Sequence, residues 1–275
     1  MMSKRLGKQL LAGPFLLWMV AFTIIPLILM GIKGFTTAEG AFTLENILAM
    51  GSEMNIQALI LSLQLSLMST VICLLLAYPL AMILRKMGDS NSVIVFLFVL
   101  PMWMNFLLRT IAWQSLLEKE GVINGILTAL HLPTIDIINT PAAIVLGMVY
   151  NFLPFMILPL YSVMSKIDGR LLEASADLGA GGLTTLRRVV FPLSFPGIVT
   201  GIIMVFIPAA STFVISQRLG DGSMLIGDLI ETFFIGAYTN FGVGSAISLV
   251  LMVLMLIFIG VLNLFDNEDV GDMLI

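Results

Sequence analysis

The sequence predicts an all-α, polytopic membrane protein with six transmembrane helices, and three observations support this fold class. Hydrophobic residues make up 59% of the 275 residues, charged residues only 11%, and the mean hydropathy is +1.07. Soluble domains are about 45–50% apolar and about 25% charged. Six stretches contain no Asp, Glu, Lys or Arg: 9–32, 54–84, 90–108, 137–165, 189–217 and 232–265. Each is close to or above the roughly 20 residues that a helix needs to cross a bilayer.

The predicted spans lie within or close to these stretches, at 10–32, 58–84, 92–112, 141–164, 195–215 and 243–264. Three cations, Lys4, Arg5 and Lys8, precede the first span, as they would in a signal peptide. The apolar stretch that follows is longer than the signal-peptide core of about 7–15 residues, and no small-residue cleavage pattern comes after it. We therefore expect the first span to be retained.

The distribution of Lys and Arg predicts that both termini are cytoplasmic. The N-terminal segment, the 85–91 turn and the 165–194 loop hold nine of the thirteen cations, and the other three loops hold three. Cytoplasmic loops carry such an excess of positive charge. The remaining cation, Arg109, falls near the outer end of the third span. We expect it to anchor that end at the interface or, alternatively, to line a pore.

The outer loops add one short element. Residues 121–130 predict an amphipathic helix at the outer surface, ended by Pro133, whereas the 216–242 loop contains several glycines and shows no domain of its own. Neither an internal repeat nor a low-complexity segment is found. Residues 1–275 are therefore expected to form a single transmembrane domain, with a cytoplasmic loop at 166–194.

Composition argues against several function classes. A net charge of −4 with scattered cations offers no basic face for nucleic acid. One cysteine and one histidine cannot form a metal cluster or a nucleophile–base pair, so no metal or cofactor site is expected. The motifs Gly-x-Ser-x-Gly and His-Glu-x-x-His are missing, and no pair of intramembrane aspartates occurs. We do not expect the chain to be an enzyme.

The 166–194 loop predicts a helix, a glycine turn and a second helix. Charged residues share one face of the first helix at spacings of three and four: Arg170, Glu173 and Asp177. Gly179 is placed to end that helix in a left-handed turn. After the second helix, Pro192 and Pro196 are expected to redirect the chain into the fifth span.

A longer pattern in this loop points to a known family. It reads Glu-Ala-small, three residues, Gly, nine residues, aliphatic, any residue, apolar, Pro. The residues that meet it are Glu173, Ala174, Ser175, Gly179, Val189, Phe191 and Pro192. This resembles the EAA loop of the permease subunits of type I bacterial ABC importers, with Ser175 for Ala, Val189 for Ile and Phe191 for Leu.

The resemblance implies a MetI-like permease fold and a coupling helix that docks in a cytoplasmic ATPase subunit. The residues it assigns to coupling are Glu173, Ala174, Ser175, Asp177, Gly179 and Arg187. The sequence contains no phosphate-binding loop, so ATP and Mg²⁺ would be bound by the ATPase and not by this chain. Six spans are too few for a whole pathway of this kind. The resemblance implies a C-type second permease, two ATPase copies and an extracytoplasmic polyamine-binding protein, assembled in membrane lipid.

Further segments resemble the permease family of spermidine/putrescine importers of the bacterial cytoplasmic membrane. They include Phe42–Asn46, Ala77–Ala81, Pro101–Asn105 with Arg109, Gly121–Asn124, Gly147–Tyr150 and Leu171–Ala180. A permease for another small solute stays open, because several of these segments also occur there. A secondary transporter is the more distant alternative, but the inverted repeats and midplane charges typical of that class are not evident.

The polyamine hypothesis raises a question of charge, since the six predicted spans contain no carboxylate. A polycation would have to be received by aromatic rings and by amide or carbonyl oxygens. The candidates near the helix breakers Pro101 and Pro154 are Trp103, Asn105, Tyr150 and Asn151, with Asp228 and Glu231 as an outer acidic lure. For each of them, an interhelical hydrogen bond is an equally good interpretation.

Overall fold

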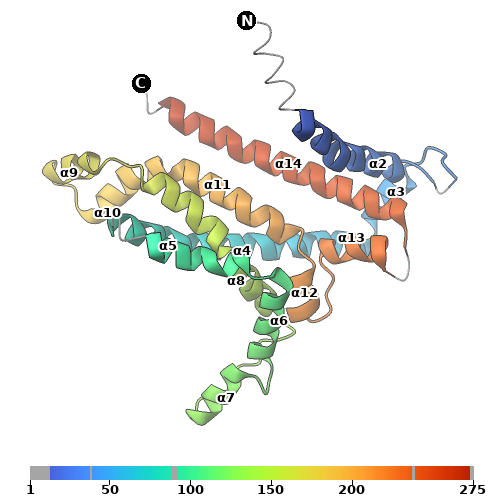
Figure 1. The fold of residues 1–275 in the computed structure, drawn as a ribbon, viewed down its shortest axis with the longest axis horizontal. Helices are drawn as coiled ribbons and strands as arrows, with labels where there is room; N and C mark the ends of the chain where they lie inside the picture. The colour runs from blue at the N-terminus through green and yellow to red at the C-terminus, as the bar shows by residue number, and fades with distance from the viewer. Residues whose placement is uncertain (1–12, 38, 88–91, 237–238, 273–275) are drawn as a thin grey trace, which may run out of the picture. The chain divides into compact units, whose positions relative to one another are not determined.

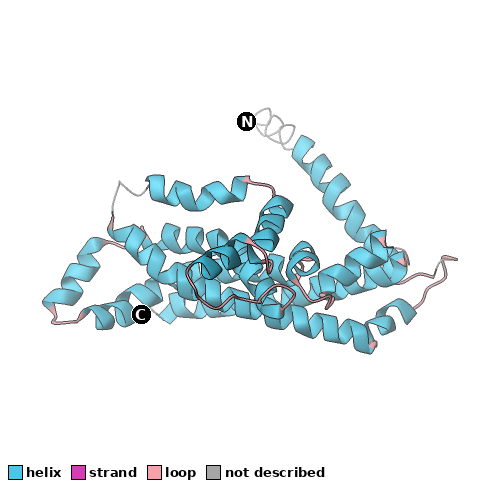
Figure 2. Ribbon diagram, turned by 90° about the horizontal axis from the view of Figure 1, so that it is seen from below, coloured by secondary structure: helices cyan, strands magenta, loops and turns pink. Residues whose placement is uncertain are grey.

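The computed structural model describes residues 13–37, 39–87, 92–236 and 239–272. These residues form helices joined by loops, without a β-strand apart from one isolated bridge between Thr36 and Phe42 (Figures 1 and 2). Within the described residues, five helices are long and apolar enough to cross a membrane, or six if one bent pair counts as a span. The all-α, multi-span fold class is thus confirmed.

Four of the predicted spans correspond to single long helices. The first, second, fourth and sixth are Gly13–Gly34, Glu53–Lys86 (α4), Pro141–Met164 (α8) and Phe241–Leu264, the last being part of α14 (Phe241–Asp272). The Gly13–Gly34 helix includes a π-turn at Val20–Ile24, followed by α2 (Ile25–Gly34). Pro79, Pro154 and Pro159 lie inside α4 and α8 without ending these helices. Length and hydropathy were therefore sufficient to find these four spans.

The third predicted span, at 92–112, is not one continuous helix in the structure. The chain forms α5 (Ser92–Val99), a 3₁₀ turn at Leu100–Trp103 and α6 (Phe106–Leu117). The helical segments Phe96–Trp103 and Phe106–Ala129 are bent by 98° relative to each other. Pro101 lies in the 3₁₀ turn, and Met104 is extended, with ψ 146°. A new helix then starts at Asn105, whose side chain caps it. The predicted outer helix follows as α7 (Val122–Ala129).

The fifth span also differs from the prediction, since it begins well before Pro192. Gly182–Ala210 is one helical segment made of α10 (Gly182–Thr185), a π-turn at Leu186–Val190 and α11 (Phe191–Ala210). The expectation that two prolines redirect the chain here is wrong. A π-turn directly before Pro192 changes the hydrogen-bond pattern where a proline ring would clash with the preceding turn.

Contacts divide the chain into two compact units: Met1–Ile56 with Leu229–Leu254, and Gln57–Asp228 with Met255–Ile275. In the first unit, α2 packs against α14, because a Cβ at Gly34 would lie 3.0 Å from Leu249 Cδ1. The short helix α3 (Glu45–Leu48) is held nearby. Its Asn46 Nδ2 donates to the carbonyl oxygens of Thr36 at 3.0 Å and Lys33 at 3.4 Å.

The second unit is built around α8, whose buried face packs against α11. Gly197 and Gly201 of α11 lie close to α8: a Cβ at Gly197 would lie 3.1 Å from Val163 and one at Gly201 2.5 Å from Met156 Sδ. Side-chain hydrogen bonding adds a link to α4, where Tyr78 Oη lies 3.0 Å from Ser194 Oγ. Close helix contact through small residues is typical of membrane interiors.

The 216–242 segment contains much of two short helices that the sequence analysis did not predict, α12 (Val214–Leu219) and α13 (Ile226–Ile235). Both helices are only six to ten residues long and flanked by glycines, so neither reaches the length of a membrane span. Among the residues of α12, Ile215 and Leu219 are fully buried.

Close packing of α12 on α8 predicts an effect of one added methyl group. A Cβ at Gly147 would lie 2.6 Å from Leu219 Cδ1 and 2.9 Å from Ile215 Cγ2. We expect Gly147→Ala to lower the free energy of unfolding by about 1–2 kcal/mol, because enclosed side chains must move to admit the methyl group. Gly125→Ala, in α7 where a Cβ meets nothing within 4 Å, is the matched control and should be neutral or stabilising. Thermal denaturation of the purified protein would compare the two; equal melting temperatures would contradict tight packing.

Candidate functional site

The 166–194 loop forms a rigid helical hairpin in the structure. Helix α9 (Gly169–Asp177) begins at Asp168, whose carboxylate accepts a hydrogen bond from Arg170 N at 3.0 Å. It ends at Gly179, which has a φ of 79°, in the left-handed region. Gly179 N donates to Ala176 O and Ala180 N to Ser175 O, at 2.8 and 3.0 Å, as in a Schellman motif. The predicted helix and its glycine end are confirmed.

A second contact closes this hairpin, which we call the coupling hairpin (residues 166–190). Ser175 Oγ lies 2.9 Å from Thr185 Oγ1, which joins α9 to α10. At its start, the hairpin is tied to α4, because Arg85 Nη2 donates to Ile167 O at 2.9 Å. Figure 1 shows α9 and α10 at one end of the second unit, beyond the ends of α8 and α11. The hairpin is thus bonded both internally and to the end of α4.

The outer surface of the coupling hairpin is exposed and partly apolar. Leu178 and Leu183 are 89% and 79% exposed. Neighbouring apolar side chains this exposed are typical of a surface that a binding partner covers. Of the residues assigned to coupling, Ser175 is half-buried and the others are exposed: Glu173, Ala174, Asp177, Gly179 and Arg187. An apolar centre with charged residues around it is typical of a protein-binding surface.

The four polar and aromatic pathway candidates make different contacts. In the described part of the chain, the ring contact of Trp103 is with Phe96, at 5.5 Å, and that of Tyr150 is with Trp113, at 5.1 Å. Trp103 is 75% exposed, whereas Asn151 is buried and donates from Nδ2 to Gly147 O at 2.9 Å. Trp103 and Asn105 lie at the bend before α6, and Tyr150 and Asn151 are neighbours on α8.

Asn105 has a structural role at the bend that sequence reasoning missed. Its Oδ1 accepts hydrogen bonds from Leu107 N at 2.9 Å and Leu108 N at 3.2 Å, so it caps the N-terminus of α6. The signal was available, because an Asn immediately before an apolar run is a typical helix start. The cap explains why a new helix begins here instead of a straight span.

This cap predicts a difference between two substitutions. We expect Asn105→Ala to lower the free energy of unfolding by about 1 kcal/mol, because two backbone N–H groups lose their acceptor. Asn105→Asp keeps an acceptor oxygen and should retain the stability of the wild type. Thermal melting of the purified protein would measure both. A melting temperature for Asn105→Ala equal to that of Asn105→Asp would show that the cap does not stabilise the bend.

The side chain of Arg109, for which the sequence left an interfacial anchor or a pore-lining role open, is buried within the chain. It is 6% exposed, and its guanidinium carbon lies 5.8 Å from the centre of the Phe106 ring. Its Nε and Nη1 make no hydrogen bond to any described residue. One turn further along α6, Trp113 lines an apolar groove of about 500 Å³ together with Tyr150. Trp113 is a candidate that sequence reasoning did not select.

Asp228, which the sequence analysis proposed as part of an outer acidic site that attracts polyamines, is a buried residue. It is 4% exposed, and its Oδ2 accepts a hydrogen bond from Leu225 N at 2.8 Å. The adjacent Ile226 N donates to Ser62 Oγ at 2.8 Å. The Asp228 carboxylate and the Ser62 hydroxyl thus accept hydrogen bonds from two backbone N–H groups at the start of α13. Glu231, on the same helix, is half-buried. In this region Asp221 is the exposed acid, and hydrogen bonds from Ser223 hold the pKa of its carboxyl below the ordinary value.

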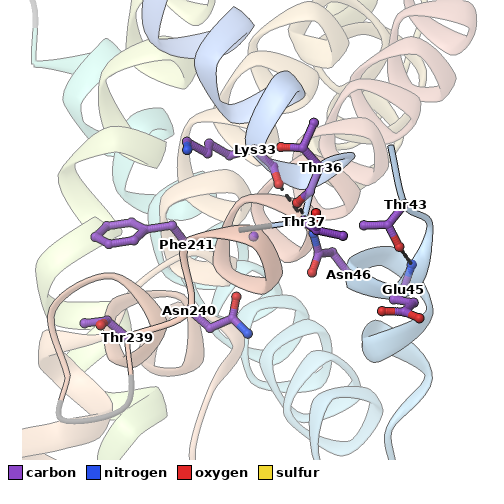
Figure 3. Close-up of a pocket in the computed structure, with 10 residues that line it drawn as sticks. Lys33, Thr36, Thr37, Thr43, Glu45, Asn46, Thr239, Asn240 and Phe241 are labelled. Atoms are coloured by element: carbon purple, nitrogen blue, oxygen red, sulfur yellow. Dashed lines mark hydrogen bonds between the residues drawn. The ribbon is translucent and has the colours of Figure 1, made fainter. Parts of the chain in front are cut away.

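A polar cavity of about 570 Å³ lies within the first unit, between the end of α2, α3 and the start of α14 (Figure 3). Its polar lining includes Thr36, Thr37, Thr43, Asn46, Thr239 and Asn240. Lys33 and Glu45 bring one charge of each sign and lie at opposite sides of the residues drawn. With balanced charges, the cavity shows no preference for a cation.

Curated relatives decide the family. No protein-family model matches the chain. The spermidine/putrescine transport system permease protein PotB of Haemophilus influenzae is 37% identical over 252 residues, 88% of each chain. PotB of Escherichia coli is 36% identical over 250 residues, which are 86% of this chain and 90% of the relative. The chain belongs to the PotB permease family.

Solved structures agree with the fold of the PotB family. A bacterial ABC transporter involved in the import of alginate has a TM-score of 0.80 at 16% identity, covering 97% of this chain and 98% of that chain. The MetNI methionine ABC transporter has a TM-score of 0.53 at 17% identity, covering 78% and 94%. These likenesses confirm the expected ABC-permease fold. As a PotB-family permease with several spans, the protein is a multi-pass protein of the bacterial inner membrane, as the sequence predicted.

Proposed function

We propose that this chain is the permease subunit of an ATP-driven importer for polyamines, spermidine or putrescine. The observation that carries the proposal is 37% identity to a spermidine/putrescine permease along 88% of both chains. The coupling hairpin supports it independently, because its helix, glycine turn and exposed leucines suit docking to an ATPase. We further propose that residues 1–275 act as one permease domain with both termini in the cytoplasm, as the loop charges predict.

The proposed assembly contains a second permease of the C-type, two copies of a cytoplasmic ATPase and an extracytoplasmic polyamine-binding protein. The ATPase supplies ATP and Mg²⁺ binding, and the binding protein provides most of the specificity. This chain forms half of the translocation pathway. Exposed apolar residues on its long helices, such as Leu75 and Met68, supply surface for lipid and for the second permease.

Transport is proposed to follow from rigid-body movement of the coupling hairpin. When the ATPase subunits close on ATP, the docked helix α9 moves with them. Its Schellman end and the Ser175–Thr185 contact keep the hairpin rigid, and the bond from Arg85 to Ile167 transmits the movement to α4. Packed elements moving as rigid bodies are a general means of passing motion between subunits. Glu173 and Asp177 are the exposed carboxylates proposed to face cations of the ATPase.

A polycation is proposed to pass along aromatic rings and amide oxygens. Tyr150 and Trp113 are the paired rings on α8 and α6, and Trp103 is the exposed ring at the bend. Each cation–π contact contributes about 0.5–2 kcal/mol, which suits passage better than tight capture. Asn105 and Asn151 already bond to backbone groups of their own helices, so they are weaker candidates.

The function is tested by transport in the reconstituted complex. We expect ATP-dependent uptake of radiolabelled spermidine or putrescine, and stimulation of ATP hydrolysis by the loaded binding protein. Tyr150→Ala should lower the stimulated rate about threefold to tenfold, because a ring contact is lost, and Trp103→Ala should act in the same direction. Tyr150→Phe keeps the ring and is the control. An assembled complex that hydrolyses ATP without responding to polyamines would instead support an importer of another small solute.

A further inference from the structure

A groove lies between the coupling hairpin and the last turns of α4, within the second unit. Its cavity of about 290 Å³ is lined on the hairpin side mainly by apolar or small residues, including Leu172, Ala176, Leu186 and Val190. On the α4 side it is lined by Met82 and by two consecutive cations, Arg85 and Lys86. The groove thus combines an apolar floor with positive charge from one helix end.

A second cavity continues this groove along α4. It has a volume of about 200 Å³ and is lined by Pro79, Met82, Ile83 and Lys86, so it shares Met82 and Lys86 with the first. From Lys86 to Pro79 the helix rises by about 10 Å towards the middle of the span. Pro79 and Ile83 are exposed apolar residues. The two cavities form one track that starts at charged residues and continues along hydrocarbon-facing side chains.

The charges at the mouth of the track are available for an anion. Neither Arg85 nor Lys86 forms an ion pair with a carboxylate of the described residues. Arg85 uses Nη2 for the carbonyl of Ile167, which leaves further N–H groups of its guanidinium. A guanidinium and a neighbouring ammonium at a helix end are well suited to a phosphate group.

We propose that this track binds an anionic phospholipid of the cytoplasmic leaflet. The phosphate lies against Arg85 and Lys86, and one acyl chain follows Met82, Ile83 and Pro79. Basic sites at the cytoplasmic ends of membrane helices recognise lipid head groups in this manner. The leaflet assignment rests on the proposed orientation of the chain. Since Arg85 also bonds to the coupling hairpin, the lipid contacts the joint between α4 and that hairpin.

Measuring how much phospholipid the complex retains tests the positive charge at Lys86 and the apolar track at Ile83 separately. The full complex is placed in nanodiscs of phosphatidylcholine with a minor fraction of phosphatidylglycerol, and bound phosphatidylglycerol is counted by native mass spectrometry. We expect Lys86→Gln and Ile83→Trp each to lower retention about fivefold or more, because one removes charge and the other fills the track. Lys86→Arg keeps the charge and should retain the lipid.

Two matched controls and one competitor decide the result. Lys166→Gln removes an exposed cation outside the groove, and Leu256→Trp enlarges an exposed apolar residue on α14; both should retain the lipid. If Lys166→Gln lost as much bound phosphatidylglycerol as Lys86→Gln, the proposal would be overturned, because the lipid would then be attracted by positive charge in general and not by this groove. Unchanged retention with Ile83→Trp would overturn the acyl track. Displacement by millimolar inorganic phosphate would show a free-anion site. Retention is read without polyamine, so a failure of the proposed transport leaves this result independent.

Discussion

Reversing the charge of Glu173 is expected to abolish most transport while leaving the permease inserted in the membrane. Glu173 is exposed on α9, away from the buried core of the second unit. In Glu173→Lys, a cation would face the cations of the ATPase that the family resemblance implies. Like-charge contacts at an interface cost several kcal/mol, so we expect uptake and co-purification of the ATPase to fall about tenfold or more.

A matched charge reversal separates docking from a general effect of charge. Glu120→Lys makes the same change at an exposed position between α6 and α7, on the side of the membrane that the proposed orientation places away from the ATPase. It should leave ATPase co-purification unchanged. Membrane insertion and melting temperature of Glu173→Lys should also equal those of the wild type, because α9 keeps its caps at Asp168 and Gly179. Wild-type uptake by Glu173→Lys would show that the coupling hairpin does not dock through this residue.

Most of the fold was predictable because two strong signals determine it. Four spans follow from hydrophobic length alone, since a helix that crosses lipid must satisfy every backbone group internally. The coupling hairpin followed from local signals. Its carboxylates lie on one helical face, and Gly179 stands just after the helix, where glycine adopts the left-handed conformation without steric strain. Both kinds of signal act within a single segment of chain.

Features that depend on competition between segments were missed. A straight third span and a bent one have the same hydropathy, and the choice was made by Asn105, which offers an oxygen to the N–H groups of Leu107 and Leu108. Similarly, the short helix α12 is stabilised by burial against α8 at Gly147, a contact between residues far apart in sequence. Composition alone cannot reveal such a contact.

Polar residues were the least predictable part of the candidate site. In an apolar chain, each Asn or Asp is readily interpreted as functional, because a polar group without a hydrogen-bond partner is costly in lipid. The structure shows local hydrogen bonds for several of them: Asn105 and Asp228 accept from backbone N–H groups at helix starts, and Asn151 Nδ2 donates to a carbonyl one turn earlier. The Oδ1 atom of Asn151 is buried and has no hydrogen-bond partner among the described residues.

Removing the carboxylate of Asp228 is expected to destabilise the protein more than removing any other cap considered above. Asp228 is buried at the third position of α13 and accepts from Leu225 N, the residue before the helix, as an acidic residue does in a capping box. In Asp228→Ala this buried N–H loses its acceptor, so we expect a loss of about 2–3 kcal/mol in the free energy of unfolding. The melting temperature in detergent should fall accordingly.

Asp228→Asn distinguishes a helix cap from a lure for polycations. The amide oxygen can still accept from Leu225 N, so a cap retains most of its stability, and polyamine uptake should stay near the wild-type rate. A lure acts through negative charge, so Asp228→Asn would then lower uptake by the same factor as Asp228→Ala while leaving the melting temperature unchanged. Measuring uptake and melting for both variants gives opposite patterns for the two roles. The hydrogen bond from Leu225 N to Asp228 Oδ2 and the burial of the carboxylate favour the cap, because a buried carboxylate offers a polycation little surface to contact.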